Sequence, residues 1–377
     1  MRRNVLRDAA RWVVPYRWIA RAAALGALLL ALCAGAPDAL AGERAGTAAE
    51  PARTTRAAAA ARPAPLLLER APCAQSGSSY EEYVERAKRQ WASDEAAARA
   101  QGRQLRPVEE FVAALPDAAG YAKRKEYAGF GCERLVYRSD GLRVVAFLWR
   151  PLQGAPAGSA GLPLIVFNRG GVGEDFKLRP NTFFGFYNYV AAGYAVLGTQ
   201  YRGNDGSEGR DEIGGADVHD VLNLFALAKE LGGIDVSRAY MLGFSRGALM
   251  TLLALEQQAP VRAAALMGAA TDWIGRPPNA GLRKMLAEHI PGFDADPDGA
   301  LRARSPLLRP QAIGVPLLLL HGGGDGLADP SDSTRYATEL LRLRKPVELV
   351  IYEGDSHGIA LNAADRDRRI LEWFARH

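Results

Sequence analysis

The residues with the clearest chemical potential lie in the stretch MLGFSRGALM, where Gly243, Ser245 and Gly247 form the pattern G-x-S-x-G. An apolar run ends at Phe244 and a helical pattern begins at Arg246. Small residues on both sides of a serine permit a turn so tight that the hydroxyl stands exposed above a sheet. The pattern therefore predicts a nucleophilic serine on a strand-to-helix elbow. The alternative is a serine that only caps a helix.

A serine needs a base to become a nucleophile, and His357 is the candidate. It lies in IYEGDSHGIA, after the last apolar run and before the last helical segment, downstream of the serine as this hydrolase order requires. The alternative is a solvated loop histidine. The other histidines are expected in a helix, in an insert, at a strand end and at the C-terminus: His219, His289, His321 and His377.

The orienting acid is expected at a strand end between serine and histidine, and Asp325 in LLLLHGGGDGLADP meets this condition. Its rivals are Asp329 and Asp332, on the same loop. The HGGG run also resembles the oxyanion loop of lipases, but such a loop precedes the nucleophile and this run follows it. We therefore interpret the run as a turn that presents Asp325.

The oxyanion hole is expected from two places. One donor is the backbone N–H of Arg246, directly after the serine. The second should come from LPLIVFNRGGVGEDF, through a backbone N–H of Asn168, Arg169 or Gly170 or through the Asn168 amide. A dinucleotide site is the competing interpretation of these glycines, but GGVG lacks the G-x-G-x-x-G spacing.

The elements that must position these residues alternate along the chain. Apolar runs such as PLIVFN, AYMLGFS and PLLLLHG are short and unbroken, as expected of strands covered on both faces, and helical stretches separate them. Before them, ERLVYRSDGLRVVAFLWRP predicts a hairpin. The pattern predicts an α/β protein with a doubly wound, mostly parallel sheet. Residues 271–310 should insert helices over the carboxyl end of the sheet. The aromatic residues of 181–189 should pack into the core, and the alternative is that they line an acyl pocket.

Residues 1–41 have the pattern of an export signal: an arginine-rich start, the apolar run AAALGALLLALCAGA, and Ala39 and Ala41 spaced as A-x-A. We predict cleavage after Ala41 and an exported, periplasmic or secreted protein with no stable membrane insertion afterwards. The alternatives are an uncleaved anchor, for which the apolar run is short, and a lipoprotein modified at Cys33, which Leu32 disfavours.

The net charge of +5 does not indicate a nucleic-acid partner. Residues 1–41 hold six arginines against two aspartates, so the remainder of the chain carries only +1.

The rest of the N-terminal third is expected to carry no catalytic residue. Residues 42–79, the first part rich in Ala, Arg, Pro and Thr, predict a disordered linker, and residues 80–131 predict a helical extension before a catalytic domain at 132–377. Cys73 and Cys132 either form a disulfide that pins this segment to the first strand, or are a loop thiol and a buried apolar residue. Neither cysteine pattern suggests a metal.

Several stretches together resemble a known family: RLVYRSDGLRVVAFLWRP, GYAVLGTQYRGNDGSEG, GGADVHDV, GFSRG, RSPLLRP, HGGGD and SHG. They are similar to the α/β-hydrolase domain of prolyl oligopeptidase-like serine hydrolases, which overlap with dienelactone hydrolase-like esterases. The resemblance covers residues 132–377 and implies a serine hydrolase with Ser245 as nucleophile, His357 as base and Asp325 as orienting acid.

The family's recurrent Tyr-Arg-Gly element is matched by YRG from Tyr201, and we interpret Arg202 as structural, paired with Asp217 or Asp220. The chain departs from the family in two places. It has NRGG where members often have HGGP or a tyrosine-bearing loop, and the helical segment before residue 132 is too short to be the β-propeller of the large family peptidases.

The sequence-based conclusion is an exported serine hydrolase that cleaves an ester or amide carbonyl through an acyl-enzyme on Ser245, with a carboxylesterase as the first interpretation. A prolyl oligopeptidase-like peptidase is the alternative, and a catalytically silent binding module is the third. The substrate is a small ester or a peptide, and no cofactor, metal or nucleic acid is expected. The oligomeric state and the acyl preference stay open.

Overall fold

The computed structural model describes residues 64–74, 77–275 and 278–377. The predicted signal segment 1–41 and the first part of the predicted linker, 42–63, lie outside these residues. Among the described helices, none is long and apolar enough to cross a membrane.

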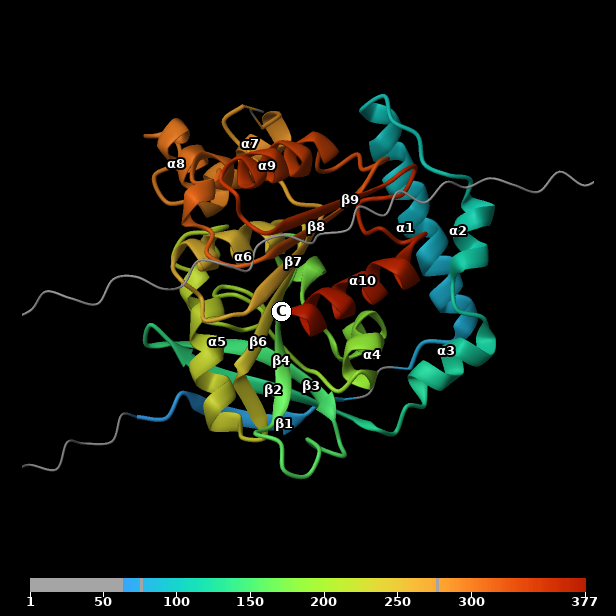
Figure 1. Ribbon diagram of the computed structural model, residues 1–377. Coiled ribbons are helices and arrows are strands. Elements are labelled where there is room, and N and C mark those ends of the chain that lie inside the picture. The colour runs from blue at the N-terminus through green and yellow to red at the C-terminus, as the bar shows by residue number, and fades with distance from the viewer. Residues whose placement is uncertain (1–63, 75–76, 276–277) are drawn as a thin grey trace, which may run out of the picture. The chain divides into compact units, whose positions relative to one another are not determined.

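The described strands form one nine-stranded sheet in the order β1-β2-β3-β5-β4-β6-β7-β8-β9 (Figure 1). Strands β4 to β9 pair in parallel with one another, whereas β1, β2 and β3 extend one edge in antiparallel pairing. The apolar runs of the sequence are these strands, and the predicted hairpin is β2–β3, so the doubly wound fold is confirmed. The bounds are β1 Leu67–Pro72, β2 Phe130–Ser139, β3 Leu142–Pro151, β4 Leu162–Asn168, β5 Ala195–Thr199, β6 Ile234–Phe244, β7 Ala263–Met267, β8 Leu317–Gly322 and β9 Val347–Tyr352.

Helices cover both faces of the sheet, which explains why the central strands are apolar without alternation. One core holds side chains of α5 (Val218–Leu231), α6 (Arg246–Glu256) and α9 (Pro330–Arg342). The opposite core holds those of α4 (Phe183–Ala191) and α10 (Ala363–Arg376). The predicted packing role of the 181–189 aromatics holds for Phe186 and Tyr189, which are buried in this second core.

The predicted linker is wrong for residues 67–72, which form the edge strand β1. Strand β1 pairs with β2 over Leu67 to Pro72 and so satisfies backbone groups that β2 would otherwise leave unpaired. Its sequence LLERAP does not alternate, and four of its six residues are exposed, so no periodic signal marks it. Cys73 directly follows β1 and forms a disulfide with Cys132. Of the two interpretations of these cysteines, the disulfide is therefore the correct one.

The segment 271–310 contains two short helices, α7 (Ala280–His289) and α8 (Pro297–Ala303), as predicted for an insert. Its described part has a small core of its own around Leu286 and Phe293, to which Ile213 of the main domain contributes. Trp273 packs against both this small core and the main core, so the insert is joined to the main domain by apolar contacts.

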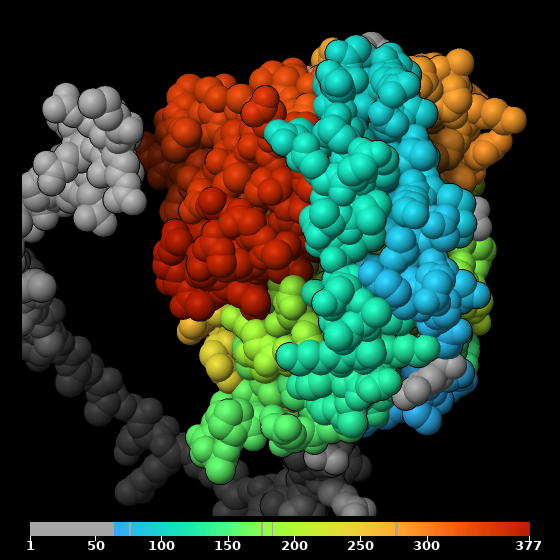
Figure 2. Space-filling view, turned by 90° about the vertical axis from the view of Figure 1, so that its right-hand side faces the viewer, coloured from blue at the N-terminus to red at the C-terminus, as the bar shows by residue number. Residues whose placement is uncertain are grey.

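The N-terminal extension is helical, as predicted: α1 (Tyr80–Ala100), α2 (Val108–Ala114) and α3 (Ala118–Lys125). We call residues 80–125 the helical arm. A capping box of Ser79 and Glu82 starts α1, and Trp91 stacks on Phe111 with ring centroids 4.4 Å apart, which holds α1 to α2. Figure 2 shows the arm running over the surface beside the C-terminal residues.

Candidate active site

The elbow predicted around Ser245 is present. Ser245 has φ 55° and ψ −123°, a conformation that a non-glycine residue adopts only where the surroundings impose it. A Cβ on Gly243 would lie 2.5 Å from the Gly247 carbonyl, and one on Gly247 would lie 1.8 Å from the Asn168 carbonyl. Both glycines of the motif are therefore required by close backbone contacts.

Asp325 and His357 are in direct contact. The distance from Nδ1 of His357 to Oδ2 of Asp325 is 2.6 Å, and both residues are buried. Burial alone would raise the pKa of Asp325, but hydrogen bonds with His321 and His357 outweigh it and hold this pKa well below its ordinary range. An ionised carboxylate accepts from Nδ1–H, so Nε2 of His357 is left to act as a base.

The rival acids have other partners. Asp329 pairs with Arg103 at 2.5 Å and caps α9, and Asp332 pairs with Arg335 at 2.7 Å. Sequence reasoning set His321 aside, yet its Nε2 lies 3.0 Å from Oδ2 of Asp325. Its position four residues before the aspartate, at the end of β8, was the available signal.

Asn168 does not face the cleft. Its side-chain amide donates to the Thr251 hydroxyl at 2.7 Å, and the residue is fully buried beneath α6. The prediction of an Asn168 amide donor is therefore wrong. A fully buried amide bonds inside the fold, and the sequence carried no information on which way this side chain turns.

Buried side chains donate hydrogen bonds to the backbone carbonyls that follow Asn168. Tyr201 Oη donates to the Arg169 carbonyl at 3.2 Å, Nη1 of Arg169 donates to the Gly170 carbonyl at 3.3 Å, and Nη1 of Arg246 donates to the Gly171 carbonyl at 3.2 Å. In a trans peptide the N–H points opposite to the C=O. The N–H groups of Gly170 and Gly171 therefore point away from these buried side chains. A Cβ on Gly170 would lie 3.1 Å from Cβ of Ser245, so this backbone adjoins the serine.

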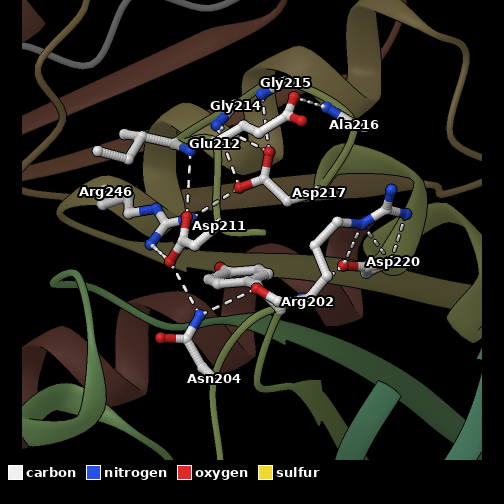
Figure 3. Close-up of polar contacts among 12 residues, drawn as sticks. Arg202, Asn204, Asp211, Glu212, Gly214, Gly215, Ala216, Asp217, Asp220 and Arg246 are labelled. Carbon is white, nitrogen blue, oxygen red and sulfur yellow. Dashed lines mark hydrogen bonds and ion pairs between the residues drawn. The ribbon is translucent and has the colours of Figure 1, made fainter. Parts of the chain in front are cut away.

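Buried ion pairs fix the residue that follows the serine (Figure 3). The Arg246 guanidinium pairs with Asp211 at 2.5 Å and with Asp217 at 2.7 Å. Arg202 instead pairs with Asp220 at 2.7 Å, which confirms its structural role and selects one of its two predicted partners. The sequence predicted a role for the backbone of Arg246 alone and carried no signal for this network.

Two cavities meet at the serine. The insert-side cavity, of about 370 Å³, is mostly apolar and includes Leu249, Trp273 and Met285. The arm-side cavity, of about 590 Å³, includes the charged residues Asp94 and Lys177. Both are lined by Ser245 and His357, so they are two halves of one cleft. The arrangement can deliver a serine, a histidine base and backbone donors to one bound carbonyl.

The helical arm contacts the loops that carry Asp325 and His357. Nη1 of Arg103 donates to the Asp325 carbonyl at 2.7 Å, and the Arg106 N–H donates to the Gly354 carbonyl at 2.8 Å. A Cβ on Gly326 would lie 2.2 Å from the backbone of the arm. The glycine-rich run around the acid is thus explained in part by the close approach of the arm.

Replacing Gly326 with alanine should separate the arm from the acid loop. We expect a loss of about 1–3 kcal/mol in the free energy of unfolding, because the new methyl group meets backbone atoms, and a fall in kcat of about tenfold from misplacement of the acid. Chemical denaturation and steady-state kinetics measure both. Gly314→Ala is the matched control, since nothing lies within 4 Å of its added Cβ. Equal behaviour of the two variants would contradict the role of this contact.

Comparisons with known proteins agree with this architecture. The model of the prolyl oligopeptidase family matches residues 180–377, more than half of the chain. A Bacillus subtilis protein described as the uncharacterized peptidase YtmA is 29% identical over 243 residues, which are 64% of this chain and 91% of that protein. Another from the same organism, the uncharacterized peptidase YuxL, is 28% identical over 260 residues, 65% of this chain and 39% of that protein.

Solved structures with the same fold include an acylaminoacyl peptidase of Pyrococcus horikoshii, with a TM-score of 0.58 and 21% identity over 69% of this chain. A puromycin-hydrolyzing peptidase of Mycobacterium tuberculosis has a TM-score of 0.57 and 24% identity over 64% of this chain. The chain spans 44% and 40% of the lengths of these two proteins. The elbow, the sheet order and the match over 180–377 lead to one conclusion: the chain is a serine hydrolase of the α/β-hydrolase fold and belongs to the prolyl oligopeptidase family.

Proposed function

We propose that this protein is a serine peptidase that cleaves peptide or aminoacyl amide bonds through an acyl-enzyme on Ser245. The observation that carries the proposal is the 2.6 Å contact between Asp325 and His357 in a cleft that Ser245 also lines.

The reaction follows from the positions of these groups. Nε2 of His357 takes the proton of the Ser245 hydroxyl while the oxygen attacks the substrate carbonyl. The histidine then gives this proton to the leaving amine, and the C–N bond breaks. Water, deprotonated by the same nitrogen, attacks the acyl-enzyme; the bond to the Ser245 oxygen breaks, that oxygen takes the proton back from His357, and the acid is released. Asp325 holds the ring in the required tautomer and stabilises the imidazolium.

The negative oxygen of the tetrahedral intermediate would be bound by two backbone N–H groups. One belongs to Arg246, the first residue of α6, and the other to Gly170. The pinned carbonyls of Arg169 and Gly170 support the second assignment, because they prevent the loop from turning a carbonyl toward the cleft. Of the three predicted loop residues, we retain Gly170 as the donor.

The names of the relatives favour a peptidase over a carboxylesterase, which was the first interpretation of the sequence. Both Bacillus relatives are described as peptidases, as are the two structural neighbours. The insert-side cavity also suits a large apolar side chain next to the scissile bond.

The test is a matched pair of substrates, phenylalanine p-nitroanilide and phenylalanine p-nitrophenyl ester, each with a free and an acetylated amino group. A peptidase should release p-nitroaniline as well as p-nitrophenol. Release of p-nitrophenol alone would return the function to the esterase interpretation, and hydrolysis of neither compound would reject both.

We further propose that the protein is exported, as its first 41 residues predict. The Cys73–Cys132 disulfide supports this, because disulfides persist in oxidising compartments and are rare in the cytosol. Fractionation of the native host, with N-terminal sequencing of the mature chain, decides the question.

A further inference from the structure

Asp94 is a buried carboxylate in the wall of the cleft. It lies on α1 and is 8% exposed, yet its side chain lines the arm-side cavity together with Ser245 and His357. It also lines a neighbouring cavity of about 600 Å³ between the arm and helices α4 and α10. Asp94 therefore lies between these two cavities, one of which also contains Ser245 and His357.

This carboxylate forms no ion pair with the described residues. Its carboxylate accepts a hydrogen bond from the neutral amide of Gln90, at 2.9 Å. Burial raises the pKa of Asp94, and the nearby Ser356 hydroxyl and His357 only partly oppose this. A desolvated anion whose hydrogen-bond donors are all neutral is costly unless a cation joins it.

The cations of the same cavity have other partners. Lys177 pairs with Asp205 at 2.8 Å, Arg366 pairs with Asp367 at 2.8 Å, and Arg169 donates to the Gln200 carbonyl at 2.8 Å. None of them lies within ion-pair distance of Asp94. Among the residues that the structure describes, Asp94 thus has no cation paired with it in the cleft.

We propose that Asp94 anchors a protonated amino group of the substrate, so that the arm-side cavity receives the amino-terminal part of a peptide. The proposal rests on the peptidase function proposed above. An ammonium group would supply the missing positive charge, and the Gln90 amide keeps the carboxylate in place to receive it.

The ammonium can come from the free α-amino group of a short peptide or from a lysine side chain. The anchor lies in the helical arm, outside the 180–377 region that the family model matches. It would therefore be a specificity device that this chain adds to the shared catalytic domain.

The experiment compares wild type with Asp94→Asn and with the control Glu95→Gln. Glu95 is the next residue of α1 and pairs with Arg99 at 2.7 Å on the exposed side, so the control removes the same charge without touching the cleft. The substrates are alanyl-phenylalanine p-nitroanilide, its N-acetyl form, and the p-nitroanilide of N-acetyl-lysyl-phenylalanine. Free and acetylated forms isolate the α-amino group, and the lysyl compound isolates the side-chain ammonium.

We expect Asp94→Asn to lower kcat/KM about 30-fold or more for at least one ammonium-bearing substrate, and to leave the neutral acetylated dipeptide within about twofold. The substrate whose kcat/KM falls identifies whether the ammonium is the α-amino group or the lysine side chain. Glu95→Gln should change nothing. Equal loss on charged and neutral substrates would overturn the proposal and make Asp94 a positioning residue for His357. An unchanged rate on all substrates would also overturn it.

A binding measurement separates this proposal from the peptidase function. In the Ser245→Ala background, three amides are titrated calorimetrically with and without Asp94→Asn: alanyl-phenylalaninamide, its N-acetyl form, and N-acetyl-lysyl-phenylalaninamide. At least one of the two ammonium-bearing amides should bind more tightly than the neutral one, and only with Asp94 present, even if the enzyme proves to cleave no anilide. Equal binding of all three amides would overturn the anchor whatever the enzyme cleaves.

A fold defect is tested by thermal unfolding. Because burial raises the pKa of Asp94 in the folded state, its charge at neutral pH opposes folding. Asp94→Asn should therefore unfold at no lower a temperature than wild type. A lower unfolding temperature would instead indicate a structural role.

Discussion

Replacing Ser245 with alanine should lower kcat by about 10⁴-fold or more while KM changes little. The variant keeps the cleft, the base and the backbone donors, but it removes the oxygen that forms the acyl-enzyme. A triad acts as a unit, so the loss of one member costs nearly as much as the loss of all. The residual rate should be that of water attacking a bound, polarised carbonyl.

Ser356→Ala is the control for this variant. Ser356 also lines the arm-side cavity and is the neighbour of His357, but it is not on an elbow. It should retain most of the activity. If Ser356→Ala were inactive and Ser245→Ala active, the nucleophile would have to be reassigned. Mass spectrometry of protein treated with a fluorophosphonate gives an independent answer, since the label should attach to Ser245.

The second large effect is expected for Asp325→Asn, which should lower kcat by about 10⁴-fold at neutral pH. An asparagine can turn its NH₂ group toward Nδ1 of His357, which then becomes an acceptor, and the proton moves to Nε2. A histidine protonated at Nε2 cannot accept the serine proton. Steady-state kinetics measure kcat, and proton NMR of the ring N–H signals reports the tautomer.

Asp329→Asn is the matched control for the acid. It removes a carboxylate from the same loop, and an asparagine can still cap α9. It loses the ion pair with Arg103 but leaves the contact with His357 intact. Activity should remain within about tenfold of wild type. Inactivity of Asp329→Asn together with an active Asp325→Asn would exchange the two assignments.

The low pKa of Asp325 also has a consequence for stability. A carboxyl group whose folded pKa lies below its unfolded value stabilises the fold at pH values above the unfolded pKa. This contribution is lost as pH falls through the folded pKa. Asp325→Asn should therefore unfold more easily than wild type at neutral pH, and the difference should shrink in acid.

The local part of the active site could be read from the sequence. G-x-S-x-G needs only a strand, a tight turn and a helix, and all three are encoded by neighbouring residues. Ser245, Asp325 and His357 could be placed after the ends of successive strands once the apolar runs had been interpreted as strands. The unbroken runs indicated a parallel sheet, since both of its faces are covered.

Other predictions failed because they depended on which residue a side chain contacts or on which strand an edge strand pairs with. Asn168 turned toward Thr251, inside the fold, and β1 was missed because an edge strand with exposed side chains has no periodic signal. The two cysteines could be paired only once β1 lay beside β2.

By itself, the sequence determined the candidates for nucleophile, base and acid and the sheet that carries them, because each depends on local conformation and on the chain order of the strands. The tertiary structure alone decided what surrounds them. It brought His321 against Asp325, held the loop after β4 through Tyr201 and Arg246, and placed Asp94 of the helical arm in the wall of the cleft. These contacts join residues far apart in the chain, and no spacing or periodicity in a single sequence encodes which distant surfaces will pack together.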